Sequence, residues 1–146
     1  MELRPLDASH DALLRTLEEQ EDVWEYVGSM LLPQEGNHLF AIVERQVAVG
    51  IGGLVKSPTL GSDEFELVCA LREDAQLRGL AHQACQLLLN WAFDTGKLEH
   101  VATCIASENQ AARTVAAKLG MREWRTLPAG RTAFVKYRDD RASAGP

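Results

Sequence analysis

Six consecutive residues, 76 to 81, carry the clearest indication of chemistry in this chain, with the pattern Gln-x-x-Gly-x-Ala. A strand-like apolar run over 65–71 precedes them, and apolar residues at helical spacing follow them to residue 93. A loop between a strand and a helix leaves backbone N–H groups open at the helix N-terminus, where the helix dipole favours an anion. Gly79 would let an anion approach the backbone closely. We therefore predict a phosphate-binding loop here.

A second pattern lies downstream, where residues 108–112 read Glu-Asn-Gln-Ala-Ala and residues 118–121 read Lys-Leu-Gly-Met. In this order and at this distance, the two patterns resemble the GNAT N-acetyltransferases, which carry Gln/Arg-x-x-Gly-x-Gly/Ala and then Glu-Asn-x-Ala-Ser … Lys-Leu-Gly-Phe. The resemblance extends over about residues 3–138. It is greatest to the ribosomal-protein-alanine acetyltransferase branch, which often has Glu-Ile-Gly-Tyr where this chain has Glu-Leu-Val-Cys at 66–69.

The resemblance implies an acetyl-CoA-dependent N-acetyltransferase that moves an acetyl group directly, in a ternary complex, to a primary amine. The acceptor would be a protein or peptide N-terminus or a small amine. The cofactor-binding residues that it implies are Leu71, Gln76, Leu77, Arg78, Gly79, Leu80, Ala81, His82 and Asn109. The competing interpretation of Arg78 is an arginine exposed to solvent. The competing interpretation of His82 is an ordinary polar residue in the first turn of a helix. Asn109 matches the family's pantetheine-binding asparagine, and its competing role is helix capping beside Ser107.

Glu66 is the candidate general base, acting through a water molecule, with Glu64 as a weaker alternative. In a strand, Glu66 shares one face with Val68 and Ala70. Partial desolvation of a carboxylate on such a face moves it toward useful base strength. The competing interpretation is a structural or surface glutamate.

No general acid is evident from the family pattern. The position where many members carry Tyr is Ala116 here, and the Ser position of the branch is Ala112. Side chains that could replace them are Cys104, Ser107 and Tyr137. These departures motivate an alternative of another class, a catalytically silent acyl-CoA-binding regulatory or sensor module.

The acceptor side of the site is indicated only weakly. Trp24 and Tyr26 lie in a region that resembles the substrate-side helices of the family, and packing of Trp24 in the core explains its presence equally well. Dimers are frequent among similar proteins, so a homodimer is an expectation that rests on the resemblance alone.

The elements that must position these residues follow from periodicity and turn signals. We predict strands over 3–6, 38–44, 46–55, 65–71, 100–106, 122–127 and 132–138, with a loop over 56–63. Helices are predicted after Asp7 or Ser9 and again around 23–31, over 81–95, and over 108–119 with Ser107 as N-cap and Gly120 as the terminating glycine. The glycines at 50, 52 and 53 indicate a bulge or close backbone approach, because no helix follows them.

The expected fold is a single α/β (α+β) GNAT-like domain over residues 1–138, with a disordered tail over 139–146. The resemblance adds that its twisted sheet is mixed, mostly antiparallel and about seven-stranded, with about four flanking helices. At 146 residues with 46% hydrophobic and 25% charged residues, the chain is ordinary for one globular domain.

Composition also excludes some classes of protein. The net charge of −6 argues against a nucleic-acid partner, which would need a basic patch. No run of about 18 apolar residues predicts a membrane span. The three cysteines are odd in number and lie in apolar runs, so we expect buried free thiols in a reducing cytoplasm rather than disulfides or a metal site.

Overall fold

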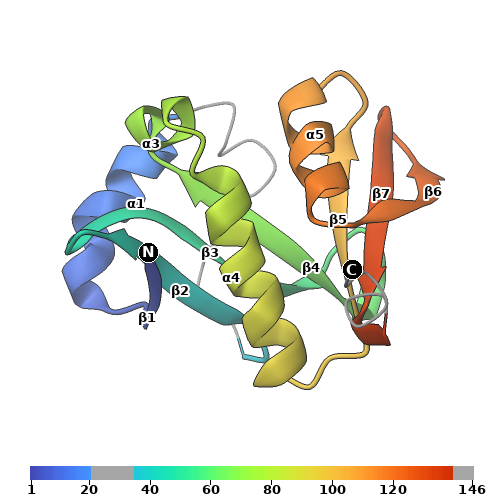
Figure 1. The fold of residues 1–146 in the computed structure, drawn as a ribbon, viewed down its shortest axis with the longest axis horizontal. Coiled ribbons are helices and arrows are strands. Elements are labelled where there is room, and N and C mark those ends of the chain that lie inside the picture. Colours follow the sequence, from blue (N-terminus) through green and yellow to red (C-terminus); the bar gives the residue numbers. More distant parts are fainter. Residues whose placement is uncertain (21–34, 140–146) are drawn as a thin grey trace.

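The computed structural model describes residues 1–20 and 35–139, and in this part of the chain seven strands form one sheet in the order β1-β2-β3-β4-β5-β7-β6 (Figure 1). The strands are β1 Glu2–Pro5, β2 His38–Glu44, β3 Val47–Ser57, β4 Gly61–Leu71, β5 His100–Ala106, β6 Arg122–Leu127 and β7 Arg131–Tyr137. The helices are the 3₁₀ turn η1 Ala8–His10, and α1 Asp11–Glu18, α3 Glu73–Leu77, α4 Ala81–Asp94 and α5 Gln110–Lys118. Strands β4 and β5 pair in parallel, and the other neighbours are antiparallel. The predicted mixed sheet and its flanking helices are confirmed.

Helices cover the two faces of the sheet unequally. Helix α4 crosses one face, seen in front in Figure 1, and its buried residues pack with those of β4, β5, β7 and α5 in the largest core cluster. On the opposite face, Leu13 and Leu17 of α1 pack on Ile51, Val55 and Val68. Alternation along the strands therefore sends successive side chains into two different cores.

The β2–β3 hairpin turns where the sequence predicts. Arg45 and Gln46 have φ of 50° and 70°, which is the two-residue turn that matches the twist of the flanking strands. The close backbone approach predicted for the β3 glycines is also found. A Cβ on Gly53 would lie 2.0 Å from the carbonyl oxygen of His38 on β2.

The predicted loop over 56–63 is wrong. Strand β3 continues to Ser57 and β4 already begins at Gly61, so a short turn joins them. The Ser57 hydroxyl oxygen accepts hydrogen bonds from the amides of Thr59 (3.2 Å) and Leu60 (2.9 Å). Ser, Pro and Gly residues that suggest a long loop thus form a compact turn around one serine side chain.

Helix α3 was not predicted. It has five residues, too few for a periodic pattern, and the amides of Ala75 and Gln76 both donate to the carbonyl oxygen of Arg72. The cap predicted for α5 is also wrong: the Asn109 side chain accepts from the amide of Ala112, whereas Ser107 Oγ donates to the carbonyl oxygen of Gly130. Gly120, with φ of 81°, ends α5 as predicted.

The other predicted strands and helices agree with the structure within a few residues, and Asp7 caps η1 through its side chain. The expected helix around 23–31 and the tail from residue 140 lie outside the described residues. Within residues 1–20 and 35–139, no helix combines the length and hydrophobicity needed to cross a membrane.

Candidate functional site

The two central strands separate at one end of the sheet. Between β4 and β5 one residue pair is in register, Glu66 with Ala102, and the Thr103 hydroxyl donates to the carbonyl oxygen of Leu67 at 3.2 Å. Beyond this point the strands diverge, β4 toward α3 and β5 toward α5 (Figure 1). Parallel neighbours that part in this way leave one edge of each strand without a ladder partner. We call this gap the splay.

The backbone groups that face the splay follow from the β3–β4 ladder. The Arg72 amide donates to the carbonyl oxygen of Val49 at 2.8 Å, so even-numbered residues of β4 bond to β3. In an antiparallel pair the alternate residues direct their N–H and C=O groups to the other side. Cys69 and Leu71 therefore present their backbone groups to the splay. Sequence reasoning missed Cys69, because its role depends on which alternate residues of β4 direct their backbone groups to the splay, and not on side-chain type.

The Leu71 carbonyl oxygen is already engaged. It accepts from the side-chain amides of Gln76 (2.8 Å) and Gln20 (3.0 Å). The contribution that Leu71 can make to the splay is thus its N–H group. Gln76, the first residue of the predicted loop motif, uses its side chain to hold β4.

The open amides of the loop lie later than predicted. The amides of Gln76, Arg78 and Gly79 donate to carbonyl oxygens within the segment, the last two at 3.1 Å. By contrast, the first four N–H groups of a helix have no partner inside it, and in α4 these belong to Leu80, Ala81, His82 and Gln83. The N-cap of α4 has no side-chain bond and its first turn has no acidic residue. Four N–H groups of this kind, at the positive end of a helix dipole, can bind an anion.

Gly79 supports this arrangement. Its φ is 71°, in the left-handed region, and a Cβ built on it would meet no atom within 4 Å. The backbone at this position is therefore free to be approached by a ligand. The dihedral angle favours glycine here, since space for a side chain exists.

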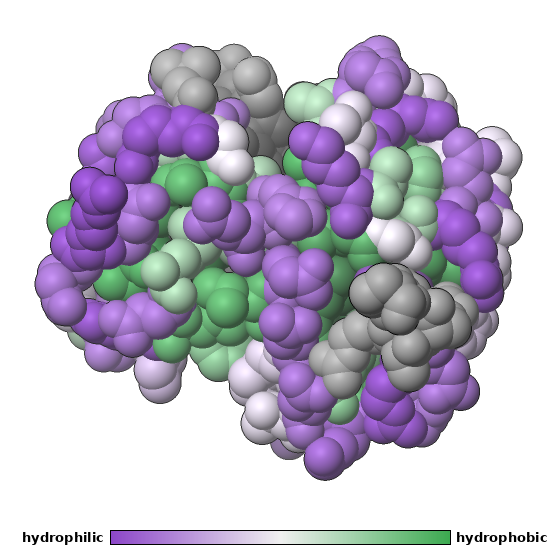
Figure 2. Space-filling view, viewed as in Figure 1, coloured by the Kyte–Doolittle hydropathy of each residue, from purple (hydrophilic) through white to green (hydrophobic). Residues whose placement is uncertain are grey.

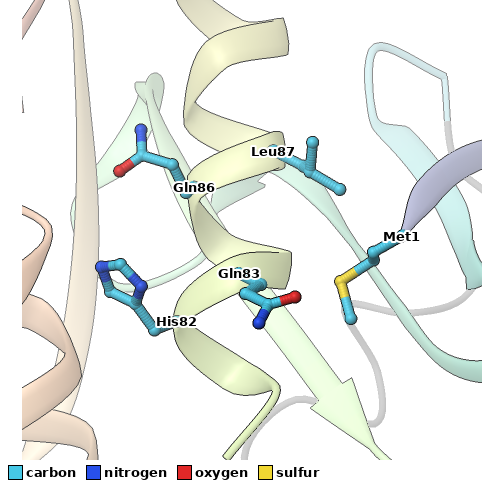
Figure 3. Close-up of a pocket in the computed structure, with 5 residues that line it drawn as sticks. All are labelled: Met1, His82, Gln83, Gln86 and Leu87. Carbon is cyan, nitrogen blue, oxygen red and sulfur yellow. The ribbon is translucent and has the colours of Figure 1, made fainter. Parts of the chain in front are cut away.

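The two basic side chains of the loop region differ in their surroundings. Arg78 is paired with Glu44 at the end of β2, at 2.5 Å. His82 points to the same side of α4 as Gln86, toward α5, whereas Gln83 and Leu87 point toward Met1 (Figure 3). These five residues, Met1, His82, Gln83, Gln86 and Leu87, line a shallow depression. Polar side chains continue along the outer side of α4 (Figure 2).

Asn109 stands at the start of α5, across the splay from α3 (Figure 1). Its Oδ1 accepts from the amide of Ala112 at 3.1 Å, so the capping role is observed. The side chain is exposed, and this cap leaves the Nδ2 group as a separate donor. The two roles weighed from the sequence are therefore compatible.

Glu66 is 1% exposed, which is more buried than the partly apolar strand face predicts. Its Oε1 accepts from Ser57 Oγ at 2.7 Å and lies 3.4 Å from Cys104 Sγ. A carboxylate can be buried when donors satisfy it in this way. Any proton exchange between Glu66 and a ligand would pass through one of the groups that contact it.

Glu64, two residues earlier on the same face of β4, is more accessible. Its Oε2 lies 2.5 Å from His100 Nε2, and both side chains are about a quarter exposed (21% and 26%). The His100 ring also stacks on Tyr137, with centroids 5.2 Å apart. Glu64, His100 and Tyr137 thus form one row across β4, β5 and β7.

Of the three predicted substitutes for a general acid, Cys104 is the one that contacts Glu66. Ser107 is bound to Gly130, and Tyr137 lies at the other end of β5 with His100. Ala116 is 2% exposed in the core. Trp24 and Tyr26, the predicted acceptor residues, lie outside the described residues.

The cysteines are free thiols, as expected, and Cys85 and Cys104 are buried, whereas Cys69 is half-buried. The Cys85 thiol and burial both raise the pKa of the Cys69 thiol. A thiol that is protonated near neutral pH is a poor nucleophile. Cys69 is thus poorly suited to take up an acetyl group, although its backbone faces the splay.

The family model for the acetyltransferase (GNAT) domain matches residues 1–122. The chain belongs to the GNAT acetyltransferase family. No curated protein sequence matches it. The GNAT-type N-acetyltransferase assignment agrees with the solved structures that share this fold.

An acetyltransferase from Agrobacterium tumefaciens is 20% identical, with a TM-score of 0.70 over 92% of this chain and 89% of that chain. A spermidine N-acetyltransferase SpeG chimera from Vibrio cholerae and hSSAT is 14% identical, with a TM-score of 0.76 over 95% and 98%. A GNAT acetyltransferase from Bacillus anthracis is 18% identical, with a TM-score of 0.72 over 94% of each chain. At these identities the structures establish the GNAT fold and leave the acceptor open.

Proposed function

We propose that this GNAT protein transfers the acetyl group of acetyl-CoA directly to a primary amine. The observation that carries the proposal is the pairing of an uncapped α4 N-terminus with a splayed β4–β5 edge. The first offers four N–H donors to a diphosphate. The second offers backbone groups to a thioester and the arm that carries it.

Each part of the cofactor has suitable partners among the described residues. The amides of Leu80 to Gln83, with His82 beside them, would hold the diphosphate. The Nδ2 group of Asn109 would bind the pantetheine arm from the β5 side of the splay. The N–H groups of Cys69 and Leu71 would meet the thioester end, where acetyl-CoA supplies the activated acyl carbon.

The backbone N–H of Cys69 is the proposed donor to the thioester carbonyl. A fixed donor at that oxygen stabilises the negative charge that develops as an amine attacks the carbonyl carbon. The thioester bond then breaks, and the thiolate takes up the proton that the attacked nitrogen loses. A thiolate is a tolerable leaving group, so the absence of hydroxyls at Ala112 and Ala116 is compatible with turnover.

Glu66 is the proposed general base, which takes a proton from the ammonium form of the acceptor before the attack. It lies on the face of β4 that is opposite α4, and Cys104 or Ser57 would relay a proton to it. Deprotonating a lysine-like amine at pH 7 costs about 4–5 kcal/mol, against about 1 kcal/mol for an α-amine. A single buried base therefore favours an α-amine or another weakly basic amine as the acceptor.

The test has two stages. Calorimetry with acetyl-CoA is expected to show binding, and a screen of amines is expected to show release of the CoA thiol. The screen includes N-terminal peptides of ribosomal proteins, which the sequence motifs favour, and spermidine, after which the similar Vibrio cholerae acetyltransferase is named. Absence of any binding heat would overturn the proposal.

The second candidate is an acyl-CoA-binding sensor without turnover. The observation in its favour is that Ala116, at the family's usual tyrosine position, is buried in the core. A sensor would bind acetyl-CoA and release no thiol with any amine, whereas the enzyme would show turnover.

A further inference from the structure

Gln20 connects two segments that are far apart in the sequence. Its Nε2 donates to the carbonyl oxygen of Leu71 at 3.0 Å, and its Oε1 accepts from the amide of Glu73 at 3.0 Å. Both halves of one side-chain amide are therefore used, one on the last residue of β4 and one on the first residue of α3. Gln20 follows α1, so it fastens α1 to the start of the segment that leads to the open amides of α4.

The Leu71 carbonyl would otherwise point into the splay. Alternation along β4 directs the Leu71 carbonyl away from β3, and no pairing with β5 is found this far along the described part of β4. An unpaired carbonyl oxygen there would present negative charge to a ligand whose own carbonyls and phosphates need donors. Gln20 and Gln76 donate to this oxygen from different segments, and so turn the end of β4 into an edge that offers mainly N–H groups.

The hydrogen bond from the Glu73 amide to Gln20 Oε1 fixes the start of α3. Helix α3 has five residues, and after it the amides of Arg78 and Gly79 bond back into the segment. A shift at Glu73 would thus be carried to Leu80 and to the amides that follow it. Gln20 therefore contributes both to the polarity of the β4 edge and to the position at which α3 begins.

We propose that Gln20 is a positioning residue for acetyl-CoA: it holds the Leu71 carbonyl and the Glu73 amide so that β4 and α4 present their donors to the cofactor together. This inference rests on the proposed function. It adds a residue more than 50 positions before the loop motif in sequence, which no local pattern could indicate.

Three variants test the role by calorimetry with acetyl-CoA and by steady-state kinetics. Gln20→Met keeps the length of the side chain and removes both hydrogen bonds. It is expected to weaken acetyl-CoA binding about threefold to tenfold and to leave the KM for the amine unchanged. Gln20→Glu keeps the acceptor for Glu73 but places a carboxylate oxygen against the Leu71 carbonyl oxygen, so its affinity is expected to be no higher than that of Gln20→Met. Glu18→Met, an exposed polar residue of α1 near Gln20, is the matched control and is expected to bind like wild type.

A double-mutant cycle with Gln76→Met separates positioning from general destabilisation. Because both glutamines donate to one carbonyl oxygen, the double variant is expected to lose more affinity than the product of the two single losses. Wild-type affinity in Gln20→Met, or losses that simply multiply, would overturn the role of Gln20 and leave the proposed function intact. A wild-type protein that binds no acetyl-CoA would instead overturn the proposed function.

Discussion

A carboxyl group inside a sheet is costly unless hydrogen-bond donors surround it. Glu66 meets this condition through Ser57 and Cys104, so its burial by itself does not distinguish a structural role from a catalytic one. Glu64 offers a contrast, because it lies on the same face, is partly exposed and is paired with His100. Comparing the two carboxylates is therefore more informative than removing one of them.

We expect Glu66→Gln to lower kcat/KM by about 10²-fold or more, as the loss of a general base does, without changing the affinity for acetyl-CoA. The amide oxygen can still accept from Ser57, so the fold is preserved. Thiol-release kinetics and calorimetry measure the two quantities. Glu64→Gln is the matched control, with near wild-type kinetics. The opposite ranking of the two variants would assign the base to the Glu64–His100 pair.

Asn109 has two functional groups, and substitution can separate them. Aspartate caps helices as well as asparagine but has no N–H donor. We therefore expect Asn109→Asp to keep the melting temperature and to lose affinity for acetyl-CoA. Asn109→Ala is expected to lose affinity and also about 1 kcal/mol of stability. If Asn109→Asp binds like wild type, the side chain has the capping role alone.

At the scale of elements, the sequence predicts a helix correctly when the helix is long enough to show apolar periodicity. Helices α4 and α5 have enough turns for apolar periodicity to indicate them. Helix α3 has five residues and is held by bonds to the Arg72 carbonyl oxygen, so it leaves no periodic signal. The loop motif identified the right segment, yet its open amides begin at Leu80, because α3 and the turn after it use the earlier ones.

Gly79 allows a test of the loop with an internal control. Gly79 and Gly130 have φ of 71° and 69°, and a Cβ on either would meet no atom within 4 Å. An alanine at either position should therefore cost a similar amount of stability, about 1 kcal/mol, through backbone strain alone. We expect Gly79→Ala also to weaken acetyl-CoA binding and Gly130→Ala to leave it unchanged. Equal affinities in thermal-shift and calorimetric measurements would contradict a cofactor role for this turn.

At the scale of the whole molecule, periodicity gave the order of elements but not their arrangement. A mixed sheet was expected from the family resemblance. To predict that the backbone groups of Cys69 and Leu71 face the splay, one would also need the register of three strands. The contact between Gln20 and Leu71 likewise joins segments that only the folded chain brings together. The parts of the site that sequence reasoning missed are therefore backbone groups and long-range contacts.

The C-terminal boundary of the domain can be tested by truncating the chain. Tyr137 is the last residue of β7, and the Arg138 amide donates to the carbonyl oxygen of Glu99 at 2.8 Å. We predict that a chain ending at residue 139 keeps its melting temperature within about 2 °C, because the sequence analysis predicts that the domain ends at residue 138. It should also be stabilised by acetyl-CoA to the same extent as the full chain.

A chain ending at residue 135 is the matched control for this truncation. It loses Tyr137, which stacks on His100, and Lys136, whose Nζ donates to the Leu119 carbonyl oxygen at the end of α5 at 2.6 Å. Without Lys136, the last turn of α5 loses a buried charge-assisted hydrogen bond. The melting temperature should then fall by far more than in the longer truncated chain. If the chain ending at residue 139 were destabilised as much, the residues after it would have to be counted as part of the domain.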